Sequence, residues 1–338
     1  MPVDRRRIEA RVRLNRLAIG GWSAQALFAA NELGVFELLK DGRSLTAAEA
    51  AGELGTDEDS TARLLGALVA TDLLEQSDGR FSNGRAAEEF LVPGRPESLA
   101  TWVALLGGWN QTFGKLAESV RSGDPAEAPE EKLGESPEYT RRFIIGMHDY
   151  AIGPGKELAR HLDLGGRRRL IDPGGGPGTY SILLAEANPE LECVVFDLPE
   201  VVAIADEVIA DHGLQKRVST VAGSYHTDDF PGGFDAALVS NTLHQEDWDS
   251  CVTILRKAHA ALEPGGLAVV HAMFLNERGD GPLWPALHNL LMLLVYRGGR
   301  AYSVEQTFGM LEEAGFENPE HHRMSPFNAG SFVTAARP

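Results

Sequence analysis

The spacing of apolar side chains predicts that the chain begins with helices. Between Ile19 and Leu39, apolar residues recur at intervals close to the helical period, which predicts a helix over this stretch. Ser44 or Thr46 can cap a second helix, and Glu49 completes a capping box if Thr46 is the cap. The N-terminal part is therefore expected to be largely helical.

A further helix and a hairpin follow in the pattern. Gly55 is placed to end the capped helix, and Asp57 or Asp59 can open the next one. The segment LLEQSDGRFSNG carries an Asp-Gly pair, which favours a small hairpin. Helix, turn, helix and hairpin in this order are typical of a winged helix, which we predict for residues 1–95.

The charge of this region decides between two roles for a winged helix. Residues 1–95 hold 12 Lys/Arg and 15 Asp/Glu, and the second helix of the motif offers only Arg63 as a base. Phosphate contacts need clustered basic side chains, so the balance favours a dimerisation module over DNA binding. The whole chain has 31 Lys/Arg and 49 Asp/Glu, a net charge of −18, which also argues against a nucleic-acid or anionic-membrane partner.

Composition bounds the class of protein further. At 338 residues and 43% hydrophobic, the chain can form about two domains with a large core. Two cysteines, Cys193 and Cys251, cannot make a disulfide framework, which fits a reducing compartment. The basic N-terminus lacks the apolar stretch of a signal peptide, and runs such as 290–296 are far shorter than the roughly 20 residues that cross a bilayer. We therefore predict a cytoplasmic protein.

The pattern changes after a helical middle segment. Residues 96–160 are predicted to form helices rich in large apolar side chains, as a linker that also contributes to a substrate pocket. Over residues 161–338, strand-like runs such as LECVVFDLP, FDAALVSNTLH and GGLAVVHAMFL alternate with helical stretches. This alternation predicts a doubly wound, Rossmann-like parallel α/β sheet.

A glycine-rich loop and an acidic residue mark a candidate nucleotide site. The loop DPGGGPG, residues 172–178, follows a strand and opens a helix, although Pro177 breaks the G-x-G-x-x-G spacing. Asp197 ends the next strand, where an acid can accept hydrogen bonds from both ribose hydroxyls. Because NAD and S-adenosylmethionine use the same geometry, the loop and the acid indicate a nucleoside cofactor without distinguishing the two.

The order of the later motifs separates these cofactors. DPGGGPG, FDLPEVV, VAGSYH, FDAALVSNTLH, LEPGGLAVVHAMFL and GGRAYSVEQTFGMLEEAGF together closely resemble the plant-type small-molecule methyltransferases and their bacterial antibiotic-pathway relatives. The resemblance covers nearly the whole chain. It implies S-adenosylmethionine as cofactor and a homodimer formed through the winged helix, which in that family also helps to close the partner's active site.

The resemblance also assigns residues to the cofactor, position by position. Asp197 would bind the ribose, Leu198 would pack on the adenine, and Ser224 would border the adenine where the family usually has Asp. The cofactor residues implied in this way are Gly174, Gly175, Gly176, Asp197, Leu198, Gly223, Ser224, Ser240 and Asn241.

The sequence departs from the family around the catalytic histidine. In the O-methylating majority this His takes the proton from a phenol, is followed by Asp-Trp, and is held by later acidic residues. Here His244 matches the base, but Gln245 follows it, and the later acids are replaced by His271, Asn289 and Ala301. The usual orienting carboxylates are therefore missing.

Histidines at these positions suggest a metal instead. The resemblance places His288 on a helix that faces His244, so these two and His271 would converge on one pocket. Two histidines and an oxygen ligand suit Zn or Fe with open positions for a substrate. Gln245 is the better third ligand by position and Glu246 by chemistry. A branch of the family C-methylates α-keto acids with a metal held by the loop His, its neighbour and a His of this helix.

The main prediction is therefore metal-dependent C-methylation of the β-carbon of a hydrophobic α-keto acid, such as 4-methyl-2-oxovalerate or phenylpyruvate. A chelated metal stabilises the enolate, with Glu246, His271 or a metal-bound hydroxide as base. Apolar residues that could wall the substrate are Trp102, Phe113, Met147, Met292 and Tyr296.

Three alternatives stay open. His244 can be the general base of an O-methyltransferase that acts on a phenolic or enolic hydroxyl, and His288 can be an ordinary core histidine. The chain can be a winged-helix regulator that kept the cofactor fold without chemistry. An NAD oxidoreductase would need a hydride-transfer constellation, which we do not find.

Overall fold

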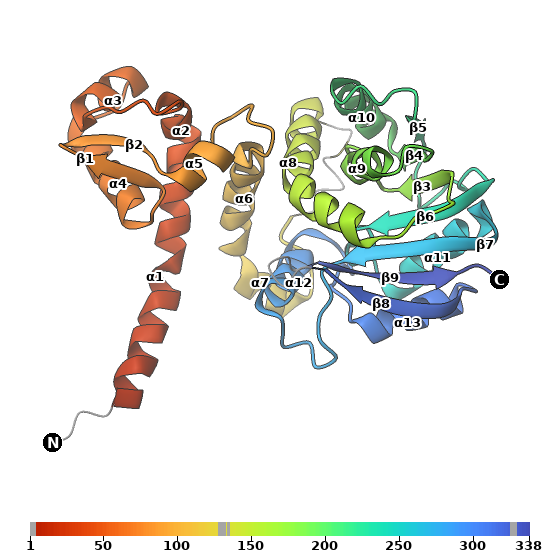
Figure 1. Ribbon diagram of the computed structural model, residues 1–338. Coiled ribbons are helices and arrows are strands. Elements are labelled where there is room, and N and C mark those ends of the chain that lie inside the picture. The colour runs from red at the N-terminus through yellow and green to blue at the C-terminus, as the bar shows by residue number, and fades with distance from the viewer. Residues whose placement is uncertain (1–4, 128–132, 134–135, 325–329) are drawn as a thin grey trace. The chain divides into compact units, whose positions relative to one another are not determined.

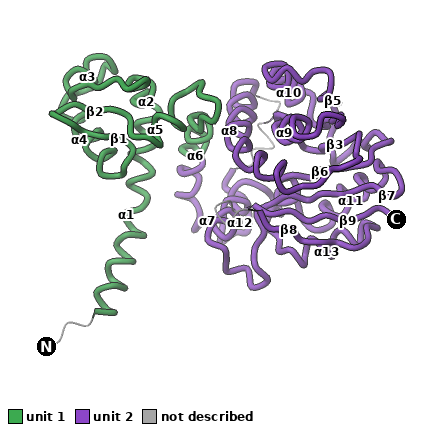
Figure 2. The backbone as a smooth tube through the Cα atoms, in the orientation of Figure 1, with its two compact units in different colours: residues 1–108 green, residues 109–338 purple. Residues whose placement is uncertain are grey.

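The chain folds into two compact units, residues 1–108 and 109–338 (Figures 1 and 2). The computed structural model describes all residues except 1–4, 128–132, 134–135 and 325–329. The predicted middle segment, 96–160, is divided between the two units. Within the residues that the structure describes, no helix is both long enough and apolar enough to span a membrane.

Helices and one hairpin build the first unit. Its elements are α1 (Arg5–Leu33), α2 (Val35–Leu38), α3 (Ala47–Leu54), α4 (Glu58–Ala70), β1 (Leu74–Ser77), β2 (Arg80–Asn83), α5 (Arg85–Phe90) and the first part of α6 (Ala100–Phe113). Thr46 caps α3 in a capping box with Glu49, Gly55 ends that helix at φ 68°, and Asp57 caps α4. The predicted helix–helix–hairpin order is confirmed, because each boundary depends on a local signal.

The predicted helix over residues 19–39 is wrong in both boundaries. The observed α1 starts at Arg5, and it ends at Leu33 because Gly34 adopts φ 77° before the short helix α2. Apolar residues on the early turns, such as Ile8 and Leu14, are exposed, so the helix extends beyond the stretch whose apolar spacing predicts it. Side-chain periodicity marks a helix that packs on a core, and it misses turns that do not.

A seven-stranded mixed sheet forms the centre of the second unit, in the order β5-β4-β3-β6-β7-β9-β8. Its strands are β3 (Arg169–Pro173), β4 (Glu192–Asp197), β5 (Val218–Ala222), β6 (Phe234–Ser240), β7 (Leu262–Ala272), β8 (Glu317–Arg323) and β9 (Ser331–Ala336). The predicted Rossmann-like fold is confirmed for the first five strands, which pair in parallel. The prediction of a purely parallel sheet is wrong, since β9 runs antiparallel to both β7 and β8.

Helices cover both faces of this sheet (Figure 1). The helices of the second unit are α7 (Leu116–Ser122), α8 (Pro137–His161), α9 (Thr179–Ala187), α10 (Pro199–Asp211), α11 (Trp248–Ala261), α12 (Leu283–Val295) and α13 (Val304–Glu313). Successive strand residues point to opposite faces. Leu238 accordingly packs in the core under α8, α9 and α10, whereas Val239 packs in the core under α11 and α13.

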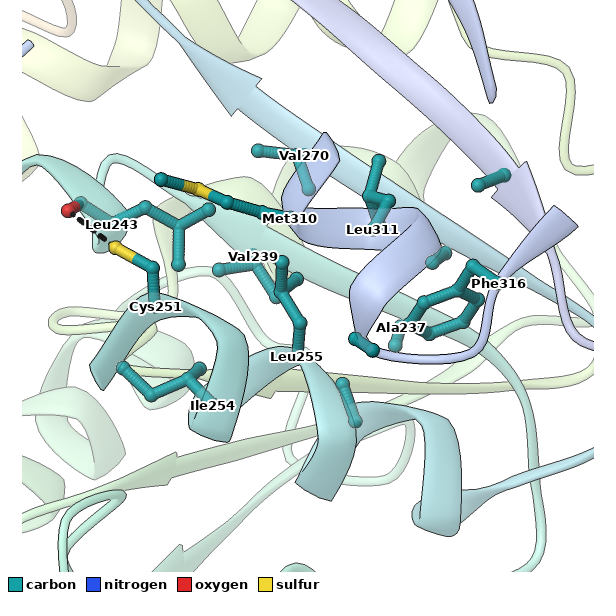
Figure 3. Close-up of a cluster of buried hydrophobic side chains, with 14 of the residues drawn as sticks. Ala237, Val239, Leu243, Cys251, Ile254, Leu255, Val270, Met310, Leu311 and Phe316 are labelled. Carbon is teal, nitrogen blue, oxygen red and sulfur yellow. Dashed lines mark hydrogen bonds between the residues drawn. The ribbon is translucent and has the colours of Figure 1, made fainter. Parts of the chain in front are cut away.

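Figure 3 shows part of the core on the α11 and α13 face. Leu255 of α11 and Leu311 of α13 lie against Val239 of the sheet, and all three are at most 1% exposed. In the same cluster the Cys251 thiol donates a hydrogen bond to the backbone oxygen of Leu243, at 3.2 Å. Leu243 begins the segment that carries His244, so this core packs against the start of the candidate catalytic loop.

Candidate functional site

The glycine-rich loop lies at the carboxyl end of β3, the edge at which parallel α/β sheets bind ligands. Position 175 has no room for a side chain, because a Cβ there would lie 2.7 Å from the carboxylate of Asp172. The loop leads directly into α9, whose N-cap is Gly178. The predicted order of strand, glycine-rich turn and helix is thus observed.

Asp197 at the end of β4 lies against this loop. Its Oδ2 accepts a hydrogen bond from the Gly176 N–H at 2.8 Å, and its Oδ1 accepts one from the Leu198 N–H at 2.7 Å. Burial raises the pKa of Asp197 to about 6, and the two backbone donors oppose that rise. The predicted combination of loop and acid is thus brought together in space.

Gly223, after β5, lies on the other side of the acid. Its N–H donates to the backbone oxygen of Asp197 at 2.8 Å, and a Cβ at Gly223 would lie 2.3 Å from the ring of Phe196. Ser224, the next residue, donates its N–H to Asp228 at 2.8 Å. The chain can pass this close to Phe196 only because position 223 has no side chain.

Gly223→Ala is expected to destabilise the second unit by about 1–3 kcal/mol, the usual cost of overpacking a core. Phe196 is only 2% exposed, so its ring cannot move into solvent to make room. Urea unfolding measures the effect. Gly232→Ala is the matched control, since a Cβ at Gly232 meets no atom within 4 Å. Equal stability of the two variants would contradict this account.

Asp172, beneath the loop, is a buried acid with one unsatisfied oxygen. Its Oδ2 accepts a hydrogen bond from Ser181 at 2.8 Å, whereas Oδ1 is buried without a partner. Burial raises the pKa of Asp172 from 3.8 to about 7. The folded state therefore binds more protons than the unfolded state between about pH 4 and pH 7, so this group destabilises the fold increasingly as the pH rises through that window.

Asp172→Asn should remove that pH-dependent cost. An acid that titrates near pH 7 instead of 3.8 costs the folded state up to about 4 kcal/mol at alkaline pH. The variant should gain stability over the wild type between pH 5 and pH 7, with a constant advantage above that, as measured by urea unfolding without cofactor. A difference of the same size at pH 5 and pH 8 would show that Asp172 is ionised throughout.

The end of β6 turns sharply into the segment that carries His244. Asn241 has φ 53°, a left-handed conformation that is unusual for a residue other than glycine. Its N–H donates to the backbone oxygen of His271 at 2.9 Å, and its Nδ2 donates to the Tyr180 hydroxyl at 3.1 Å. Ser240 pairs with Nδ1 of His271 at 2.9 Å. These contacts hold the strained turn in place.

His271 is therefore placed beside the end of β6. Its side chain is 2% exposed and its ring lies 5.1 Å from the ring of Tyr180. Burial lowers the pKa of His271 to about 4, so its ring is neutral at pH 7. Its role as a catalytic base stays a prediction.

His244 and His288 do come together as the sequence predicts. Their ring centroids are 4.6 Å apart, with the ring planes at 82°. Burial, and then the neighbouring His288, lower the pKa of His244 well below its ordinary value, and burial lowers the pKa of His288 to about 4. Nδ1 of His288 is buried without a hydrogen-bond partner. At pH 7 the site thus presents two neutral imidazoles side by side.

The backbone of the His244 segment is held by two residues of the segment between α12 and α13. His244 lies on a short 3-10 turn, Leu243–Gln245, labelled η2. Its backbone oxygen accepts a hydrogen bond from the Arg300 N–H at 2.9 Å, and the backbone oxygen of Glu246 accepts one from the Tyr302 hydroxyl at 2.8 Å. Tyr302 could not be found from the sequence, because its hydrogen bond to Glu246 joins segments that are distant in the chain.

The two candidate oxygen ligands have other partners. Nε2 of Gln245 lies 3.5 Å from the backbone oxygen of Asn241. Oε1 of Glu246 accepts a hydrogen bond from the Tyr225 hydroxyl at 3.0 Å and lies 3.4 Å from Nε2 of His226. Among the described residues, no group of three or more His, Cys, Asp or Glu side chains is arranged to hold a metal ion.

Part of the predicted substrate wall forms a cluster in the second unit. Met292 of α12 and Tyr296, which directly follows this helix, are 3% and 8% exposed, and Phe113 packs against their cluster. Met147 is partly buried on α8, outside this cluster, and Trp102 belongs to the first unit. Met292 lies on α12, the helix that also carries His288.

Models of known protein families match almost the whole chain. The O-methyltransferase domain matches residues 99–317, and the O-methyltransferase dimerisation domain matches residues 15–93. The structure resembles that of human N-acetylserotonin methyltransferase in complex with S-adenosylmethionine, with a TM-score of 0.90 and 26% identity over 99% of both chains.

Characterised relatives agree with this match. The 3-hydroxy-5-methyl-1-naphthoate 3-O-methyltransferase of Streptomyces sahachiroi is 34% identical over 96% of this chain and 94% of its own. The L-tyrosine C(3)-methyltransferase of Streptomyces lavendulae is 31% identical over 90% of this chain and 86% of its own. The chain therefore belongs to the O-methyltransferase family with an N-terminal dimerisation domain, and it is an S-adenosylmethionine-dependent methyltransferase.

Proposed function

We propose that this enzyme O-methylates an acidic phenolic or enolic hydroxyl of a small natural product, with His244 as general base. The observation that carries the proposal is the pair of neutral imidazoles, His244 and His288, without an orienting carboxylate among the groups that set the pKa of His244. Bound S-adenosylmethionine supplies an electrophilic methyl group. The chain has to orient the acceptor oxygen and take its proton.

The lowered pKa of His244 points to the kind of hydroxyl. A neutral imidazole can accept a proton, but a base of lowered pKa removes protons readily only from an acidic donor. A phenolic or enolic hydroxyl is acidic enough to meet this condition, and an aliphatic alcohol is not. The imidazolium that forms at His244 would lie against His288, whose unpartnered Nδ1 can accept a hydrogen bond from a donor close by.

The relatives support this acceptor class. One is named for O-methylation of a hydroxynaphthoate and another for C-methylation of tyrosine, and both acceptors carry an aromatic hydroxyl. The side chains of Met292 on α12 and of Tyr296, which follows this helix, suit an aromatic ring. The dimerisation domain supports a homodimer as the working unit.

Metal-dependent C-methylation of an α-keto acid is the second candidate. The same two histidines favour it, because they offer two nitrogen donors near each other. A third donor does not join them, since no group of three or more His, Cys, Asp or Glu side chains among the described residues is arranged to hold a metal ion, and Oε1 of Glu246 already accepts a hydrogen bond from Tyr225. The donor set is thus incomplete for a three-ligand site, and we derive no step through a metal.

One assay separates these two functions. The enzyme is incubated with labelled S-adenosylmethionine and either 3-hydroxy-1-naphthoate or phenylpyruvate, before and after treatment with EDTA. We expect a methyl ether of the naphthoate, formed at the same rate with and without chelator. Methylation of phenylpyruvate on carbon, lost on chelation and in His288→Ala, would overturn the proposal and establish the second candidate.

A further inference from the structure

Tyr225 borders the glycine-rich loop and is hydrogen-bonded to the segment that carries His244. The residue lies in the loop after β5 and follows Gly223 and Ser224 in the chain. An atom at the Cβ position of Gly174 would lie 3.5 Å from Cε1 of Tyr225, so the aromatic ring borders the glycine-rich loop. Its hydroxyl donates to Oε1 of Glu246 at 3.0 Å, two residues beyond His244.

The surroundings keep this hydrogen bond in place. The Glu246 side chain is only 12% exposed, so water has little access to its carboxylate. Burial, and then Glu246, raise the pKa of Tyr225, so the hydroxyl stays protonated and remains a donor. Tyr296 and then Asp197 raise the pKa of Tyr225 further in the same direction.

We propose that the Tyr225–Glu246 hydrogen bond is a positioning link that couples cofactor binding to the placement of His244. The Tyr225 ring supports the loop that includes Gly174, while its hydroxyl fixes the segment that carries the base. Ordering the loop around the cofactor therefore also orders the base. This proposal depends on the cofactor but not on the identity of the acceptor.

The Tyr225–Glu246 hydrogen bond acts by ordering the Tyr225 ring before the cofactor binds. A ring held by its hydroxyl loses little further freedom when the cofactor binds, whereas a ring without that bond has to be ordered at the moment of binding. Hydrogen bonds to a charged partner contribute about 1.5–3 kcal/mol. If all of this free energy contributed to cofactor binding, its loss would weaken the affinity by roughly 10-fold to 100-fold. Because only part of this free energy contributes to cofactor binding, we expect the affinity to fall by about 5-fold to 10-fold.

Binding of S-adenosylhomocysteine to the intact dimer, measured by titration calorimetry, tests the link. Tyr225→Phe keeps the ring and removes the donor, and it should weaken binding by about 5-fold to 10-fold. Glu246→Ala should match it, and the double variant should be no weaker than either single one. Glu246→Gln, which keeps an acceptor oxygen, should restore affinity to within about twofold of the wild type.

Tyr302→Phe is the matched control. It also removes a hydroxyl bonded to Glu246, but that bond goes to the backbone oxygen, away from the cofactor loop. Its affinity for S-adenosylhomocysteine should stay within about twofold of the wild type. The proposal is overturned if Tyr225→Phe lowers the melting temperature without changing the affinity, or if Glu246→Gln is as impaired as Glu246→Ala. Failure of the O-methylation proposal would not affect this test, since no acceptor is present.

Discussion

His244→Gln lowers methyl transfer to a phenolic acceptor by about 10²-fold to 10⁴-fold, the usual contribution of a general base. Glutamine is similar in size but cannot take a proton at neutral pH. The loss should appear in kcat at saturating S-adenosylmethionine, because His244 lies on the 3-10 turn Leu243–Gln245 and not in the glycine-rich loop. Steady-state kinetics with 3-hydroxy-1-naphthoate measure it.

Two further measurements make this result specific. The affinity of His244→Gln for S-adenosylhomocysteine should stay within about threefold of the wild type, since a missing base does not disturb the ribose site. His161→Gln, an exposed histidine at the end of α8, controls for the substitution itself and should leave turnover unchanged. Retention of more than a tenth of wild-type kcat in His244→Gln would contradict the assignment of His244 as the base.

Asp197→Ala gives the opposite signature, a loss of cofactor affinity. Hydrogen bonds to a charged partner contribute about 1.5–3 kcal/mol each, so losing two ribose hydroxyl contacts should weaken binding by roughly 10²-fold to 10⁴-fold. The carboxylate also accepts the Gly176 and Leu198 N–H groups, so its removal loosens the loop as well. Titration calorimetry with S-adenosylhomocysteine measures the affinity.

Asp197→Asn refines that prediction. The amide keeps one acceptor oxygen, so the variant should bind more tightly than Asp197→Ala and less tightly than the wild type. Glu192→Ala, an exposed acid at the other end of β4, is the matched control and should bind normally. A fall in melting temperature for Asp197→Ala without a loss of affinity would show that the acid supports the fold and not the ribose.

Features specified by neighbouring residues could be predicted from the sequence. The Thr46 capping box, the Gly55 helix end and the hairpin turn at 78–79 each depend on residues close together in the chain. The antiparallel strands β8 and β9 escaped prediction because β8 has the sequence ENPEHHR, in which no alternation of apolar and polar residues marks a strand. Tertiary pairing with β9 makes it a strand.

The site divides in the same way. The glycine-rich loop and Asp197 are predicted by a spacing that the fold imposes, and the structure brings them together. The orientation of Glu246 could not be predicted, because the 3-10 turn ends at Gln245 and Glu246 continues in an extended conformation. That one change of backbone conformation gives Gln245 and Glu246 different partners. Tyr225 and Tyr302 were missed because their hydroxyl contacts join segments far apart in the chain.

The arrangement of the cores has a consequence for calorimetry. The cluster around Phe36 and Leu68 lies within residues 1–108, whereas the two clusters on the faces of the sheet lie within residues 109–338. Proteins with more than one cooperative unit often depart from two-state unfolding. A heat-capacity scan can then contain two overlapping endotherms, and only the one shifted by S-adenosylhomocysteine would report on the methyltransferase unit.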